Sequence, residues 1–111
     1  MEKILTLVLV TFVLLISTFT LPAIASDTVN GEQIFSNYCA GCHMNGGNIV
    51  RRGKNLQKQA LNKYGMNSIE AVISIVTNGK SNMSAYKDRL SEQQIQHVAT
   101  YVIEQAEKDW R

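Results

Sequence analysis

The sequence contains few of the side chains that usually bind metal ions or cross-link a chain, with two cysteines and two histidines in 111 residues. A structural zinc site normally takes four Cys or His ligands. The only histidine besides His43 is His97, which falls in a segment with helical periodicity. This scarcity of ligands argues against zinc. A thioredoxin-like redox pair would need a βαβ pattern around its cysteines, and none is visible.

The sequence also lacks the alternation of apolar and polar residues that is typical of β-strands. It contains no internal repeat and no low-complexity tract. Apolar residues recur instead at helical spacing, and 111 residues are enough for one domain. We therefore predict an all-α domain of about four helices.

No large excess of charge is present, since the formal net charge is only +2. So modest an excess argues against nucleic acid as a partner. No nucleophile–base set is visible, so we do not expect an enzyme. Five cations nevertheless fall in one segment without an acid between them, and this segment is either a solvated helix face or a docking patch for an acidic partner. They are Arg51, Arg52, Lys54, Lys58 and Lys63.

The first residues have the pattern of a secretory signal peptide. Lys3 gives a basic start, residues 4–19 are almost entirely apolar, and Ala23-Ile24-Ala25 has the A-x-A form of a cleavage site. A permanent membrane anchor is the alternative, but the apolar run is short for a membrane span. We predict a signal peptide at residues 1–25 and an exported domain at residues 26–111 that is not anchored to a membrane.

Cys39-Ala40-Gly41-Cys42-His43 matches the C-x-x-C-H signature of c-type haem attachment. Cys39 and Cys42 can each form a thioether to one haem vinyl group, and His43 can supply an axial nitrogen to the iron. A disulfide between the two cysteines is the alternative in an exported chain. Export also suits haem c, which is attached outside the cytoplasm.

A second axial ligand has to come from elsewhere in the chain, and Met is a common partner of His in electron carriers. Met44 adjoins His43 and cannot reach the opposite face of the haem, whereas Met66 is expected to fill the core. Met83 lies in a helix-free loop far enough along the chain to wrap the haem. His97 lies off the apolar stripe of the last helix, and we expect it on the solvated surface. Met83 is therefore the predicted ligand.

Four segments are predicted to be helical. The first begins at Asn30 and runs into the cysteines, the second covers residues 55–64, and the third begins near Asn67 and ends at Gly79. Ser91 and Gln94 form a capping box for the last helix. The last helix has a broad apolar stripe that we expect to pack against the first helix, with Gly31 allowing close approach and Phe35 and Tyr101 filling the crossing.

Over nearly all of residues 26–111 the chain resembles the cytochrome c6 family of soluble photosynthetic electron carriers. The residues that carry the resemblance are Gly31, Phe35, the haem box, Lys54 to Leu61, Asn78-Gly79-Lys80, Met83, Arg89-Leu90-Ser91, Val98 to Val102, Gln105-Ala106 and Trp110. The resemblance implies the small class I cytochrome c fold around one covalent haem c. It also implies a monomer in the thylakoid lumen of a plastid or cyanobacterium, which takes an electron from cytochrome f of the cytochrome b6-f complex and delivers it to photosystem I.

The chain departs from the family pattern at two positions. Ser84 stands where a Pro usually follows the ligand Met, and Ser cannot stiffen the loop as Pro would. Ile75 stands where the family commonly has a Gln beside the haem, and Ile cannot donate a hydrogen bond. We therefore expect a lower reduction potential than is usual for the family.

Three alternative functions stay open at this point. One is a periplasmic cytochrome c that donates to a respiratory oxidase. Another is a low-potential c6-like protein with a sensor or regulatory role. The third is an enzyme or ligand sensor with an open haem position, which requires that Met83 does not bind the iron.

Overall fold

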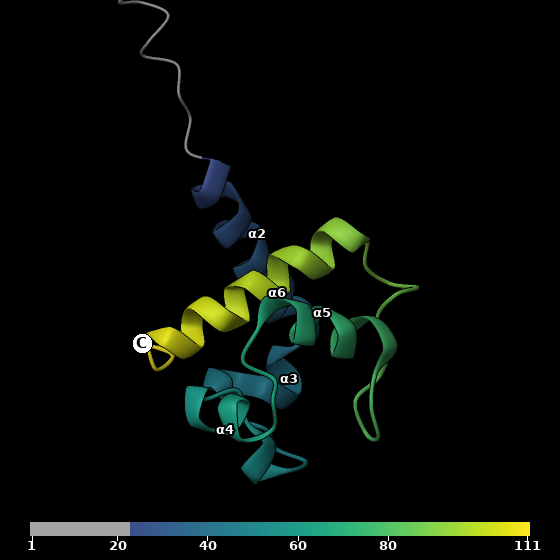
Figure 1. Cartoon of the computed structure of the whole chain (residues 1–111). Helices are drawn as coiled ribbons and strands as arrows, with labels where there is room; N and C mark the ends of the chain where they lie inside the picture. The colour runs from purple at the N-terminus through teal and green to yellow at the C-terminus, as the bar shows by residue number, and fades with distance from the viewer. Residues whose placement is uncertain (1–22) are drawn as a thin grey trace, which may run out of the picture.

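The computed structural model describes the backbone of residues 23–111 and the side chains of residues 30–111. The α-helices in this part are α2 (Ala23–Tyr38), α3 (Ala40–His43), α4 (Lys58–Lys63), α5 (Ile69–Asn78) and α6 (Glu92–Glu107), with 3₁₀ turns η1 (Met44–Gly46) and η2 (Arg52–Lys54) (Figure 1). Pairing of the β type is limited, within this part, to an isolated bridge between Lys80 and Met83. The predicted all-α fold is confirmed. Of the helices described, none has the length and apolar character needed to cross a bilayer.

The predicted signal peptide at residues 1–25 lies outside the described residues except for Ala23–Ala25, which begin α2. It stays a prediction. The expected helix start at Asn30 is wrong, because α2 already runs through that position. No Gly or Pro stands between Ala23 and Gly31, so nothing in the local sequence forces the chain out of the helix before Asn30.

The last helix forms as its local signals predict. Ser91 Oγ accepts the Gln94 backbone N–H at 3.1 Å, and Gln94 Oε1 accepts the Ser91 backbone N–H at 2.8 Å. These reciprocal bonds are a complete capping box, and they satisfy two backbone donors at the helix terminus. The capping box thereby fixes the residue at which α6 begins.

Helix α6 crosses α2 and also packs against α5 (Figure 1). A Cβ atom on Gly31 would overlap the His97 carbonyl oxygen and lie 2.7 Å from Tyr101 Cβ, so only glycine lets the two backbones approach this closely. The Phe35 and Tyr101 rings lie 5.4 Å apart at this crossing. The predicted packing of the first and last helices is confirmed.

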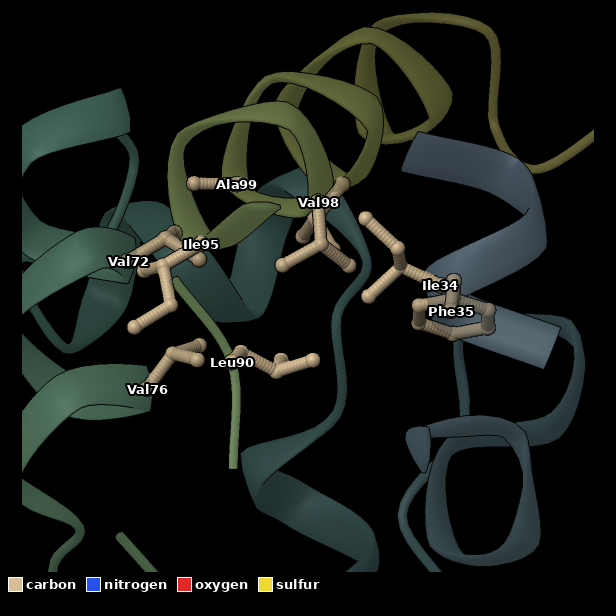
Figure 2. Packing of buried hydrophobic residues seen from close by; sticks show 9 residues of the cluster. Ile34, Phe35, Val72, Val76, Leu90, Ile95, Val98 and Ala99 are labelled. Atoms are coloured by element: carbon tan, nitrogen blue, oxygen red, sulfur yellow. The ribbon is translucent and has the colours of Figure 1, made fainter. Parts of the chain in front are cut away.

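The buried core lies where α2, α5 and α6 meet (Figure 2). Val98 and Ala99 of α6 are at most 1% exposed, and in Figure 2 Val72 of α5 lies beside Ile95 and Val76 lies beside Leu90. Leu90 and Ile95, on either side of the α6 cap, are buried in the same cluster. Burying side chains of this size contributes about 1.5–3 kcal/mol each, and it holds α5 and α6 as one frame.

The second and third helices begin later than the sequence predicts. Asn55 does not start a helix, because its Oδ1 accepts the Gln57 backbone N–H at 2.9 Å and forms a local turn. Helix α4 therefore covers only Lys58–Lys63. Helix α5 is capped by Ser68, whose Oγ accepts the Ala71 N–H at 3.1 Å, and not by Asn67. It ends at Gly79, as predicted, where φ is +71°.

Candidate functional site

The C-x-x-C-H segment forms a short helical turn directly after α2. Within it, the His43 N–H bonds the Cys39 carbonyl at 2.9 Å. Both thiols are free, so the alternative disulfide between Cys39 and Cys42 is not formed. Cys42 is exposed, whereas Cys39 is partly covered, and burial raises the pKa of the Cys39 thiol to about 11. The turn therefore presents two thiols and one imidazole next to each other.

The orientation of the His43 ring is fixed by one hydrogen bond. Its Nδ1 lies 2.8 Å from the carbonyl oxygen of Gly47. A carbonyl oxygen can only accept, so Nδ1 carries the hydrogen, and in the neutral imidazole Nε2 then has the lone pair that can bind a metal. A metal-binding imidazole is usually held in this way, with the second nitrogen donating to a carbonyl.

A cavity of about 320 Å³ is lined by all four predicted site residues, Cys39, Cys42, His43 and Met83. The first three come from the turn after α2, and Met83 comes from the loop after α5. Most of the remaining lining is apolar and includes side chains from α5 and α6. The fold thus brings a thioether sulfur and an imidazole, 40 residues apart in sequence, to the same cavity.

The other candidate ligands are placed differently. Met44 is 65% exposed and does not line the cavity. Met66 was expected to fill the core, but it lies outside the core cluster and lines the cavity. His97 was expected on the solvated surface, but it is half-buried at the α2–α6 crossing and does not reach the cavity. In the part of the chain with described side chains, no three His, Cys, Asp or Glu residues are grouped to hold a metal ion.

The loop that carries Met83 is tied back to itself. The Lys80 N–H bonds the Met83 carbonyl at 3.0 Å, and the Met83 N–H bonds the Lys80 carbonyl at 2.9 Å. Farther along, the Tyr86 N–H bonds the Val76 carbonyl at 2.8 Å, and the Tyr86 hydroxyl donates to the Tyr38 carbonyl at 3.1 Å. These bonds restrain the loop on both sides of Met83.

Three further side chains of the cavity bear on what it can hold. Ile75 of α5 lines it, and its side chain offers no hydrogen-bond donor. Arg51 and Lys54 line it as well, so two of the five cations in the basic segment belong to the site. Sequence reasoning missed this role, although their position soon after His43 could have indicated it.

The five cations of the basic segment have different surroundings in the structure. The Lys58 Nζ pairs with Glu107 Oε2 of α6 at 3.0 Å, so one of its charges has a partner. The ammonium groups of Lys54 and Lys63 lie 5.2 and 5.5 Å from the centre of the Tyr64 ring. Arg51 and Arg52 are exposed.

The residues of the cavity fit a haem attached by two thioethers. Two free thiols lie beside an imidazole whose Nε2 lone pair is available, and a thioether lines the same cavity. The apolar lining suits a porphyrin, and Arg51 and Lys54 match the charge of its carboxylates. This fold and donor set define a small all-α cytochrome c.

Comparison with known proteins narrows this class. A family model described as "Cytochrome C oxidase, cbb3-type, subunit III" matches residues 26–102. A "Cytochrome c6-like" protein and a "Cytochrome c6" of Nostoc sp. (strain PCC 7120) are 73% and 50% identical to this chain, and each alignment covers all of both chains. The crystal structure of cytochrome c6C from Synechococcus sp. PCC 7002 superposes with a TM-score of 0.72 at 59% identity, covering 73% of this chain and 99% of that one. The chain belongs to the cytochrome c6 family and carries a covalently bound haem c.

Proposed function

We propose that this member of the family is a diffusible one-electron carrier that takes electrons from cytochrome f of the cytochrome b6-f complex and delivers them to photosystem I. The observation that carries the proposal is the cavity that brings Cys39, Cys42, His43 and Met83 together. The full-length similarity to a cytochrome c6 supports the same partners. Delivery to photosystem I implies a thylakoid lumen, with a bacterial periplasm as the alternative compartment.

Each residue of the cavity has a definite task in the proposal. Cys39 and Cys42 would hold the haem through thioethers, and His43 and Met83 would bind its iron. When bound, the haem supplies a one-electron couple between ferrous and ferric iron. The apolar lining would exclude water from the haem, and Arg51 and Lys54 would pair with its carboxylates. No residue of the cavity has to form or break a substrate bond.

The proposed exported form begins at Ser26, since a signal peptide of residues 1–25 is removed. The family-model match also begins at residue 26, which supports this boundary. Export would bring Cys39 and Cys42 to the compartment where haem c is attached. An N-terminal sequence of the purified holoprotein that begins upstream of Ser26 would contradict this boundary.

Ile75 favours a second candidate function within the same family. An apolar side chain in the cavity favours a lower potential than a Gln would give. The 73% identical relative is named "Cytochrome c6-like" and not cytochrome c6. A carrier of low potential would have a different acceptor from photosystem I, in keeping with a sensor or regulatory role.

The axial ligands are tested by spectroscopy of the purified holoprotein. Ferric haem with a Met ligand gives a near-infrared band from charge transfer between sulfur and iron. We expect this band in the parent and in Met66→Ala, which alters another methionine of the same cavity, and its loss in Met83→Ala. A parent without the band has an open or different ligand position, which contradicts the proposed carrier.

The acceptor is tested by adding the reduced holoprotein to isolated photosystem I and following re-reduction of the photo-oxidised centre after a flash. Re-reduction that accelerates in proportion to the concentration of the added protein supports the leading proposal. Normal spectra without such re-reduction favour the low-potential candidate.

A further inference from the structure

We propose that Trp110, at the end of the chain, is a positioning residue for His43. Its indole clamps the Gly46–Gly47 backbone, and the Gly47 carbonyl in turn fixes the orientation of the His43 imidazole. The proposed role of Trp110 rests on His43 being an iron ligand, as argued above. Trp110 would thus influence His43 without contacting it, through the backbone of Gly46 and Gly47.

The chain makes an unusual turn to bring the indole into place. Asp109 and Trp110 have φ values of +55° and +59°, a region that side chains other than glycine seldom occupy. The Trp110 N–H bonds the Gln105 carbonyl at 2.8 Å, and the Asp109 N–H bonds the Ala106 carbonyl at 3.3 Å. This is the Schellman pattern without its usual glycine. The backbone strain of two such residues in succession has to be offset by other contacts, and the Trp110 side chain supplies one.

The compensating contact is with the loop after the haem box. The indole covers Gly46 so closely that a Cβ there would lie 2.6 Å from Trp110 Cδ1. The Nε1–H of Trp110 donates to the Leu56 carbonyl at 2.9 Å, and the Leu56 N–H donates to the Gly46 carbonyl at 2.8 Å. One ring therefore touches both members of a backbone pair that closes this loop.

The clamped backbone leads directly to His43. Gly47 follows Gly46, and its carbonyl accepts the His43 Nδ1–H at 2.8 Å. Two successive glycines have more conformational freedom than any other pair, and Gly46 sits at φ +77°. Without the indole above Gly46, two backbone bonds still restrain this segment, from the Gly47 N–H to the Met44 carbonyl at 3.0 Å and from the Leu56 N–H to the Gly46 carbonyl at 2.8 Å, but neither involves the Gly47 carbonyl itself.

The hydrogen bond at Nδ1 affects the electron donation of the opposite nitrogen. Donation from Nδ1–H to a carbonyl raises the basicity of the imidazole as a ligand. A more basic ligand stabilises ferric relative to ferrous iron and lowers the potential. A looser Gly47 carbonyl weakens this bond, so the potential should rise when Trp110 is removed.

A purely structural role is the competing explanation, because Trp110 also lies 5.2 Å from the Phe35 ring and 6.0 Å from the Tyr101 ring, measured between centroids. The test uses Trp110→Phe, which keeps an aromatic ring but removes the N–H donor, and Trp110→Ala, which removes both. Ile103→Ala is the control, because Ile103 packs on the core from α6, the helix that precedes Trp110, without lining the cavity. Midpoint potential, thermal midpoint and hydrogen–deuterium exchange of the His43 Nδ1–H are measured on each ferrous holoprotein.

We expect Trp110→Ala to raise the potential and to speed Nδ1–H exchange roughly tenfold, as loss of about one hydrogen bond from a local opening equilibrium implies. Trp110→Phe should fall between the parent and Trp110→Ala, and Ile103→Ala should lose thermal stability alone. If Trp110→Phe and Ile103→Ala both lose stability while keeping the potential and exchange rate of the parent, Trp110 is a core residue and the inference is wrong. A parent without His43 ligation would instead overturn the proposed function, and its spectrum shows this before any variant is made.

Discussion

At the scale of single residues, Ile75 has the clearest chemical consequence. It lines the cavity together with Met83 and His43 and offers no donor to either. An amide at this position could donate to an axial ligand, withdraw electron density from it and favour ferrous iron. The identity of this one side chain therefore bears on which partners the carrier can reduce.

We predict that Ile75→Gln raises the midpoint potential by roughly 40 mV. One hydrogen bond contributes about 1 kcal/mol, and a tenfold change in a one-electron equilibrium corresponds to about 59 mV. Redox titration of the holoprotein measures the change. Ile75→Val, which stays apolar, should remain close to the parent, and an unchanged midpoint in Ile75→Gln would remove Ile75 as the cause of a low potential.

The residues of the site differ in how far the sequence could predict them. Cys39, Cys42 and His43 form a contiguous motif, and Met83 was expected from its place in a loop. The contribution of Gly47 is a backbone carbonyl, which no side-chain pattern reveals. Arg51 and Lys54 reach the cavity only because the loop after His43 folds back. Contacts made by backbone atoms or by the path of a loop depend on tertiary structure, so local patterns missed them.

At the scale of elements, the predicted boundaries were accurate where a side chain caps the backbone without competition. Ser91 and Gln94 satisfy each other's backbone donors, and α6 begins at the residue they predict. Asn30 was expected to cap the first helix, but the preceding residues are themselves helical, so no free donors remain there. A capping residue marks the start of a helix only if the residues that precede it are not themselves helical.

Replacing Ser91 with Ala should therefore lower the free energy of unfolding by about 1 kcal/mol. The change removes the acceptor for the Gln94 N–H beside a buried pair, Leu90 and Ile95. Denaturant unfolding of the oxidised holoprotein measures the effect. Ser74→Ala is the matched control, because Ser74 is exposed within α5 and alanine there should be neutral or slightly stabilising. Equal losses in both variants would show that the cap is unimportant.

At the scale of the whole molecule, two packed helices provide a frame on which an otherwise loop-rich chain is arranged. The α2–α6 crossing is closed by Gly31, and α5 packs on the other flank of α6. The turn after α2 supplies Cys39, Cys42 and His43 to the cavity, and the loop of residues 79–90 supplies Met83. This division explains why the all-α class could be predicted from periodicity, whereas the cavity between the loops could not.

The distribution of charge gives the last prediction at this scale. Arg51, which lines the cavity, and Arg52, which does not, are both exposed, while Lys58 is paired with Glu107. If these arginines guide an acidic partner, the rate of electron transfer with that partner should rise about tenfold as ionic strength falls from about 0.1 M to about 0.01 M, since the Debye length grows from about 10 Å to about 30 Å. Flash kinetics with photosystem I, or stopped-flow mixing with cytochrome f, give this rate.

The variant Arg52→Gln, which leaves the cavity-lining Arg51 in place, should lose part of this salt dependence and react several-fold more slowly at low ionic strength. Lys87→Gln is the control, because it removes an exposed cation of the 84–90 loop outside the basic segment. If only the net charge of the protein mattered, both variants would react more slowly, by the same factor for each charge removed. If the arginines form a local docking surface, only the arginine variant reacts more slowly. Rates that do not respond to salt in the parent would identify the basic segment as a solvated surface, and recognition would then depend on the exposed apolar pair Ile49 and Val50 beside it.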